Sequence, residues 1–217
     1  IDPLTHTMPL FRQLHPEIDI EWSARPLSGF EFTPVDSLAE EYDLIILDHP
    51  FMGSVAASGS LAPLDRIEGL SDAMFVGPSL RTYRMDGKLW ALPVDAACQV
   101  AVSRPDLMKT LGAEPPGNWD GLLALGAKAR RQAMHLAMGL AGVHSLMTFF
   151  TLMANLCAPC AVVREEALAD RDVAREALGL MRGLLEFCPP GVLGWNSIRL
   201  HDEMAARDDL VYCPAVY

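Results

Sequence analysis

The chain has 217 residues, of which 51% are hydrophobic and 21% charged, a composition that excludes an intrinsically disordered protein. Its 17 basic and 28 acidic residues give a formal net charge of −11, which disfavours nucleic acid and anionic lipid as partners because phosphate attracts basic surfaces. Five cysteines are too few for a scaffold built from disulfides. The chain starts at Ile1 without a recognisable leader, so we expect either a removed leader or a fragment.

The first part of the chain alternates between helical and extended patterns. Apolar residues spaced as on a helix precede Pro16, which cannot continue a helix. A four-residue apolar run ends at Asp48, which is typical of an interior strand covered by helices on both faces. The predicted helices are residues 3–14 and 34–41, and the predicted strands are residues 18–22 and 44–47. This order of elements indicates an α/β fold.

Turn residues divide the centre of the chain. Gly59 is expected to end a helix, and Asp86-Gly87 is expected to form the turn of a β-hairpin. Pro105 suits the first turn of a short helix that ends at Gly112. The next predicted elements are a strand at residues 99–102 and a helix that starts at residue 119.

The last part of the chain contains a long stretch without Asp, Glu, Lys or Arg, between Arg131 and Arg164. Histidine, asparagine, proline and glycine interrupt it, so we interpret it as a buried strand, a turn and a buried helix rather than a membrane span. Ser145 is expected to cap that helix, and Asp172 to cap the next one. The predicted strands are residues 136–138 and 210–212, and the last predicted helix is residues 198–206.

These elements suggest two lobes, with chain crossings near Pro93 and near Tyr212. The predicted first α/β lobe covers residues 1–94, and a second, helix-rich α/β lobe covers residues 95–210. Residues 211–217 would then begin the return crossing.

Several short motifs follow one another in a recognisable order. They are Tyr42-Asp43 before the run at 44–47, Gly59-Ser60-Leu61-Ala62-Pro63-Leu64-Asp65, Asp86-Gly87-Lys88-Leu89-Trp90-Ala91-Leu92-Pro93, Arg104-Pro105-Asp106-Leu107 and Trp119-Asp120-Gly121-Leu122-Leu123. Together they resemble the family 1 extracellular solute-binding proteins, the binding components of ABC importers for sugars and related solutes. The resemblance covers residues 1–130 well and the rest more loosely.

The resemblance implies a periplasmic-binding-protein-like, two-lobe fold that closes over a small solute, such as a sugar, and presents it to an ABC import permease. It also implies a periplasmic or extracellular location, no cofactor or metal, and contact with a membrane only through the permease or a lipid anchor. Members of the family begin with a strand and continue well past the position of Tyr217, so we expect a truncated chain, incomplete at both ends. Trp90 replaces the more usual tyrosine, and Gly121 replaces the usual glutamate.

The strongest candidate site follows the run at 44–47, where Asp48, His49 and Phe51 stand together. Ligands of open α/β sheets bind at the carboxyl ends of strands, and a carboxylate, an imidazole and an aromatic ring suit a polyol. The alternative is a capping aspartate in a proline turn. Asp95 is a further candidate because the resemblance places it near the cleft and hinge, and it too is a candidate cap.

The second predicted lobe supplies the other candidates. His144 and Ser145 stand at the start of an apolar helix, whose free N–H groups can meet a polar ligand, unless Ser145 only caps it. Trp195-Asn196 lie in a loop rich in glycine and proline, where the indole either stacks on a sugar or packs down. Tyr212, on the last predicted strand, faces either the cleft or the core.

An enzyme is the competing class of function. Cys157 and Cys160 form a C-x-x-C motif, which suits a thiol-redox pair, a local disulfide or two inert thiols, and Asp48 with His49 suits acid–base chemistry. The motif follows a predicted helix instead of opening one, and the second ligand pair of a zinc site is missing from the sequence. Nucleophile-elbow, P-loop, zincin and dinucleotide motifs are also missing. We therefore favour a binding protein.

Overall fold

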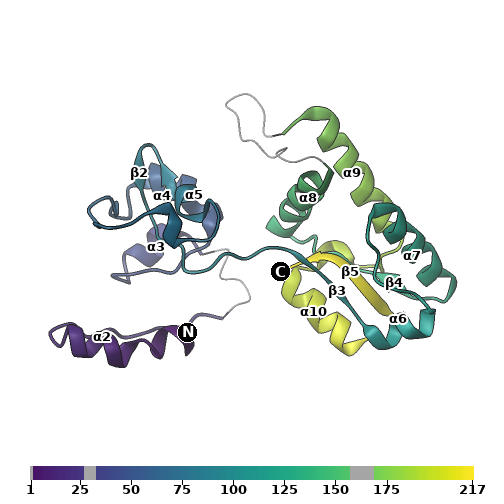
Figure 1. Ribbon diagram of the computed structural model, residues 1–217, viewed down its shortest axis with the longest axis horizontal. Helices are drawn as coiled ribbons and strands as arrows, with labels where there is room; N and C mark the ends of the chain where they lie inside the picture. Colours follow the sequence, from purple (N-terminus) through teal and green to yellow (C-terminus); the bar gives the residue numbers. More distant parts are fainter. Residues whose placement is uncertain (1, 27–32, 157–168) are drawn as a thin grey trace. The chain divides into compact units, whose positions relative to one another are not determined.

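A computed structural model describes residues 2–26, 33–156 and 169–217 (Figure 1). The chain divides into two compact units, Ile1–Ala96 and Ala97–Tyr217, whereas the sequence interpretation separates the lobes between residues 94 and 95. Among the described residues, no helix combines the length and the apolar character needed to cross a membrane.

The first unit is built from short elements. They are α1 Asp2–Thr5, α2 Met8–Leu14, α3 Val35–Ala39, the 3₁₀ helix η2 His49–Phe51, α4 Met52–Ser58, the 3₁₀ helix η3 Asp72–Met74, α5 Ser79–Thr82, β1 Arg84–Met85 and β2 Lys88–Leu89. Its small core consists of Val35, Met52, Val55 and Trp90. Gly59 ends α4 in the left-handed conformation, with a φ of 68°, as predicted.

The predicted helix at residues 3–14 is two helices. Thr7 separates them, and its hydroxyl donates a hydrogen bond of 2.7 Å to the carbonyl of Leu4. Pro9 lies in the first turn of α2, where its missing N–H leaves no bond unmade. In an uninterrupted helix the ring of Pro9 would clash with the carbonyl of Thr5. The prediction of one helix is therefore wrong because it overlooked Pro9.

The two strands predicted before residue 50 are not formed among the described residues. Residues 18–22 are irregular, and the Ile18 side chain is exposed. At residues 44–47 the side chains alternate as in a strand, because Leu44 and Ile46 are 78% and 51% exposed while Ile45 and Leu47 pack against the core of the unit. This run pairs with no described strand, so the prediction of an interior strand buried on both faces is wrong.

The predicted hairpin is confirmed. Strands β1 and β2 pair antiparallel, and their turn residues Asp86 and Gly87 have φ values of 53° and 74°. Two consecutive residues with positive φ are the requirement of a type I′ turn, which aspartate and glycine tolerate. Behind the turn, the indole N–H of Trp90 donates to the carbonyl of Met85 at 3.0 Å. The hairpin thereby holds Trp90 in the core.

In the second unit, helices pack around a three-stranded sheet (Figure 1). Its elements are β3 Val100–Ser103, α6 Pro105–Leu111, α7 Trp119–Arg131, β4 His135–Leu136, α8 Val143–Leu156, α9 Arg171–Leu185, the 3₁₀ helix η4 Val192–Gly194, α10 Ser197–Ala206 and β5 Leu210–Val216. The strand order is β3-β5-β4, with β5 antiparallel to β3 and parallel to β4. Helix α10 packs against β5 and α7 against β4.

The central strand β5 is longer than its sequence predicts. Residues 211–216, which the sequence interpretation assigns to a return crossing, lie in β5 and bond to strands on both sides. All but one of its seven side chains are buried. At its start, the guanidinium of Arg207 makes two hydrogen bonds of 2.8 Å to the carboxylate of Asp209.

Two of the predicted helix caps are wrong. The cap of α9 is Asp170, whose side chain accepts from the N–H groups of Asp172 and Val173, while the carboxylate of Asp172 pairs with Arg175 at 2.8 Å. Helix α8 starts at Val143, so Ser145 lies inside its first turn, and its hydroxyl donates back to the carbonyl of Gly142. At α9 both Asp170 and Asp172 fit the capping pattern, and at α8 the helix simply begins two residues before Ser145.

A close approach between α7 and the chain after α9 depends on a glycine. A Cβ atom at Gly126 would lie 2.5 Å from the ring of Phe187, whereas a Cβ at Gly179, on the exposed face of α9, would meet nothing within 4 Å. We expect Gly126→Ala to lower the free energy of unfolding by about 1–3 kcal/mol through overpacking. Gly179→Ala should raise it by about 0.5–1 kcal/mol through helix propensity alone. Guanidinium unfolding followed by circular dichroism measures both, and equal effects would contradict this packing.

Candidate functional site

The first unit contains a cavity of about 520 Å³. Two irregular segments, residues 43–48 and 91–95, contribute most of its wall, and the turn at 61–64 contributes the rest together with Tyr83 and Trp90. Most of the lining side chains are aliphatic. The charged ones are Asp43, Asp48 and Asp95, and all are negative.

The polar part of this cavity is centred on Tyr83. Burial, followed by the negative charges of Asp95 and then Asp48, raises the pKa of the Tyr83 phenol above its usual value. The imidazole of His49 stands edge-on to the Tyr83 ring, with 5.2 Å between ring centroids. Its Nε2 lies 3.3 Å from the carbonyl of Thr82, a geometry in which the ring N–H donates. Two carboxylates and a phenol therefore come together at the cavity, while His49 packs against the Tyr83 ring without lining the cavity itself.

Local structure explains why these groups converge. Asp48 has an extended backbone, with φ −74° and ψ 144°, and it immediately precedes η2 and α4. Its side chain makes no capping hydrogen bond to that described helix, so the capping alternative does not account for it. Tyr83 is the residue between α5 and the hairpin, and Asp95 follows the hairpin and Pro93.

Burial and packing argue against several of the remaining sequence candidates. Phe51 packs against the core of the first unit and does not line the cavity. In the second unit, Trp195 and Tyr212 are only 8% and 6% exposed and belong to the main hydrophobic core. Side chains buried to this degree have little surface to stack on a solute, so we remove both from the candidate site.

The other candidates of the second unit have structural partners. The side chain of Asn196 accepts from the N–H of Arg199 and so caps α10. His144 Nδ1 lies 3.1 Å from the hydroxyl of Ser197, which links the start of α8 to the start of α10. Ser145 is occupied by the carbonyl of Gly142, as described above.

Tyr83 is the site residue that sequence reasoning missed. It stands just before the hairpin, outside the motifs that the sequence analysis singles out. Its closeness to Asp48 is set by tertiary packing over a long sequence separation, which no local pattern reveals.

The cysteines give no support for redox chemistry in the described part of the chain. Cys157 and Cys160 lie outside the described residues. Burial raises the pKa of Cys188 and of Cys213 to about 12, which keeps both thiols protonated and unreactive at neutral pH. Within the described ranges, no group of three or more His, Cys, Asp and Glu side chains is arranged to hold a metal ion.

Comparison with solved structures identifies the fold. No protein-family model and no curated protein matches this sequence. A solute-binding protein of an ABC transporter from Thermotoga lettingae, bound to α-D-tagatose, matches with a TM-score of 0.77 at 16% identity, over 98% of this chain and 57% of that one. One from Agrobacterium vitis, with bound D-mannitol, matches with a TM-score of 0.66 at 20% identity, over 97% of this chain and 54% of that one.

A third match broadens the range of ligands. UgpB from Mycobacterium tuberculosis, in complex with glycerophosphocholine, has a TM-score of 0.70 at 18% identity, over 97% of this chain and 57% of that one. The chain thus spans little more than half the length of these structures. It has the periplasmic-binding-protein fold, and the predicted α/β, two-lobe fold class is confirmed.

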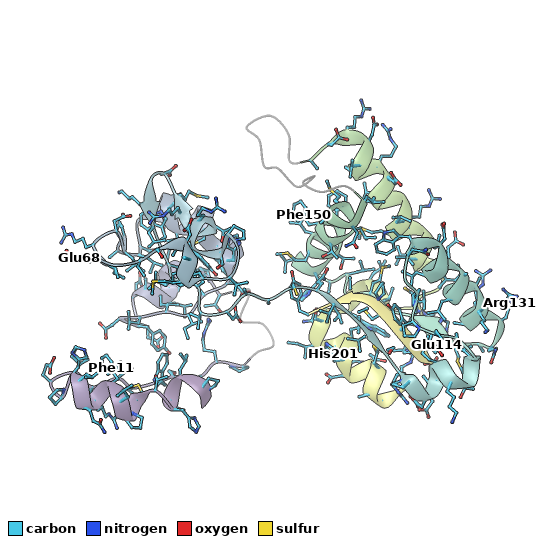
Figure 2. The ribbon with its side chains drawn as sticks, in the orientation of Figure 1. Phe11, Glu68, Glu114, Arg131, Phe150 and His201 are labelled. Carbon is cyan, nitrogen blue, oxygen red and sulfur yellow. The ribbon has the colours of Figure 1, made fainter. Side chains whose placement is uncertain are left out.

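The surroundings of Tyr83 make a titration prediction. Because Asp95 raises its pKa, Asp95→Asn should move the pKa of Tyr83 back towards the ordinary value, and Glu68→Gln, at a position that points outward from the first unit (Figure 2), should not. The difference in tyrosinate absorbance between the wild type and Tyr83→Phe isolates this residue during a pH titration. An unchanged Tyr83 pKa in Asp95→Asn would show that the carboxylate and the phenol are not neighbours.

Proposed function

We propose that this chain binds a small, polyhydroxylated solute, a sugar or polyol, and serves as the recognition component of an ABC importer. The supporting observation is the fold likeness, which extends over 97–98% of the chain to solute-binding proteins, two of them solved with D-mannitol and α-D-tagatose. The partner implied is an import permease, and the location implied is periplasmic or extracellular.

Asp48, Asp95 and Tyr83, which we call the Tyr83 cluster, can form the hydrogen bonds that such a solute needs. The carboxylates of Asp48 and Asp95 accept hydrogen bonds from hydroxyl groups, and the phenol of Tyr83 both donates and accepts. A hydroxyl removed from water needs such partners, because an unpaired polar group in a desolvated site is costly. Hydrogen bonds to charged groups are the stronger ones, so Asp48 and Asp95 are the residues expected to contribute most.

An acid–base enzyme is the weaker proposal. His49 directs Nε2 at the carbonyl of Thr82, so this nitrogen is occupied by the fold. The Tyr83 cluster also lacks a serine, cysteine or lysine nucleophile among its described members. A solute that is bound but not consumed favours the transport proposal, and turnover of the bound compound would favour the enzyme. Reduction of insulin disulfides tests the C-x-x-C pair separately.

Ligand binding should be visible as thermal stabilisation. A screen of hexoses, pentitols, hexitols and glycerophosphodiesters by thermal shift should find a compound that raises the melting temperature, because a ligand that binds only the folded state stabilises it. Isothermal titration calorimetry then measures its affinity. A complete lack of stabilisation by all these classes would contradict the proposal.

Replacing Asp48 tests the site itself. Asp48→Ala should weaken binding of that compound by about 1.5–3 kcal/mol, the range for a hydrogen bond to a charged group. Glu68→Ala, which also removes one negative charge, should leave the affinity unchanged. Trp195→Ala should instead lower the free energy of unfolding by about 3–5 kcal/mol, because the indole is part of the core. Equal losses of affinity in Asp48→Ala and Glu68→Ala would remove Asp48 from the site.

A further inference from the structure

His49 is a sequence candidate for the solute site that does not line the cavity. It contacts a residue that does, because its exposed ring stands at 78° to the Tyr83 ring, with 5.2 Å between the ring centroids. Aromatic rings favour this edge-to-face arrangement. A histidine placed in this way can affect the cavity through Tyr83.

The same imidazole also holds the backbone next to Tyr83. Its Nε2 lies 3.3 Å from the carbonyl oxygen of Thr82, and since a carbonyl only accepts, the ring N–H is the donor. Thr82 is the last residue of α5, and the last carbonyls of a helix have no partner within the helix. His49 thus supplies a hydrogen bond to the end of this short helix, one residue before Tyr83.

Other contacts hold the remaining parts of Tyr83. The N–H of Trp90 donates to the Tyr83 carbonyl at 3.1 Å, and the Tyr83 ring packs against the small core of the first unit. Two torsion angles set the direction of a tyrosine ring, so the contacts on the ring determine where its hydroxyl group points. His49 adds one such contact to those of the core.

The place of His49 in the chain connects this contact with the solute site. His49 directly follows Asp48, whose extended backbone leads from the run at 44–47 into η2. The start of η2 therefore brings a carboxylate to the cavity wall and, one residue later, an imidazole to the Tyr83 ring. The contact between His49 and Tyr83 ties the phenol to the segment that carries this carboxylate.

We propose that His49 is a positioning residue of the solute site, which holds the Tyr83 phenol beside the two carboxylates of the Tyr83 cluster and does not itself touch the solute. The hydrogen bond to Thr82 and the edge-on ring contact supply this restraint. The negative charges of Asp95 and Asp48 act on this phenol, which agrees with its position. The effect on solute affinity rests on the proposed function, whereas the restraint on the phenol does not.

Titration of Tyr83 tests the restraint without any solute. His49→Ala should lower the pKa of the Tyr83 phenol towards its ordinary value, because a released phenol moves into water and away from the carboxylates. Imidazoles in general are neutral at the pH at which phenols ionise, so the loss of a histidine changes no charge there. The tyrosinate absorbance of each variant, minus that of the same variant with Tyr83→Phe, isolates this residue.

Matched variants identify the contact responsible. His49→Gln retains an N–H donor, and His49→Phe retains an aromatic ring without the donor, so each should restore part of the shift in the Tyr83 pKa that His49→Ala removes. His15→Ala removes another exposed histidine of the first unit, one that contacts the Phe11 ring, and should leave the Tyr83 pKa unchanged. Circular dichroism should show wild-type secondary structure in all of them.

Calorimetry with the compound found by thermal shift tests the consequence for binding. His49→Ala should weaken binding about three- to tenfold, as expected for the loss of one neutral hydrogen bond, and His49→Gln should recover part of this loss. A wild-type Tyr83 pKa in His49→Ala would overturn the proposal, and if affinity still fell, His49 would touch the solute itself. If no compound binds, the proposed function fails, and the titration still decides whether His49 positions Tyr83.

Discussion

The structure depends on how its backbone N–H and C=O groups are paired by hydrogen bonds. The two units differ in how completely they pair them. In the second unit, β5 exchanges hydrogen bonds with β3 on one side and β4 on the other. An apolar strand can be buried only when its polar backbone is satisfied in this way. Helices α7 and α10 then cover the sheet with the side chains of the main core. Much of the second unit is arranged around this one strand.

The first unit solves the same problem only in part. Its hairpin is paired, and the turn that precedes it is tied to the hairpin because the N–H of Leu64 donates to the carbonyl of Leu89 at 2.7 Å. The apolar run at 44–47 has no such partner among the described residues, and the cavity of the first unit lies beside it. One structural feature thus explains both the exposure of Leu44 and the cavity.

The candidate solute site is a consequence of where that run ends. Asp48 leaves it with an extended backbone just before α4, and the hairpin brings Tyr83 and Asp95 to the same place. Burial of the phenol next to two carboxylates creates a polar patch with accepting groups in excess, which matches a ligand rich in hydroxyl donors. The absence of basic side chains from the described lining agrees with the chain's net charge of −11 and disfavours an anionic solute.

Features that depend only on neighbouring residues follow from the local sequence. Asp86-Gly87 specifies its turn because both residues tolerate positive φ, and Pro105 and Gly112 mark the ends of α6 for similarly local reasons. The order of the motifs was enough to indicate the fold class and the placement of Asp48 at the end of an apolar run. The local sequence does not decide whether an apolar or aromatic residue is buried in the core or exposed, because that depends on which distant residues pack against it.

Contacts between distant segments settle the other cases. The indole of Trp195 is buried in the core, and the Arg207 guanidinium covers it, with 5.8 Å between the guanidinium carbon and the ring centroid. The backbone carbonyl of Trp195 accepts hydrogen bonds from the N–H groups of Leu140 and Ala141. The run at 44–47 stays half exposed because a strand is buried on both faces only when neighbouring strands pair with it. The apolar pattern of the run does not indicate whether such a neighbour is present. The meeting of Tyr83 with Asp48 and Asp95 likewise depends on contacts between distant segments, whose chemistry is invisible until the chain has folded.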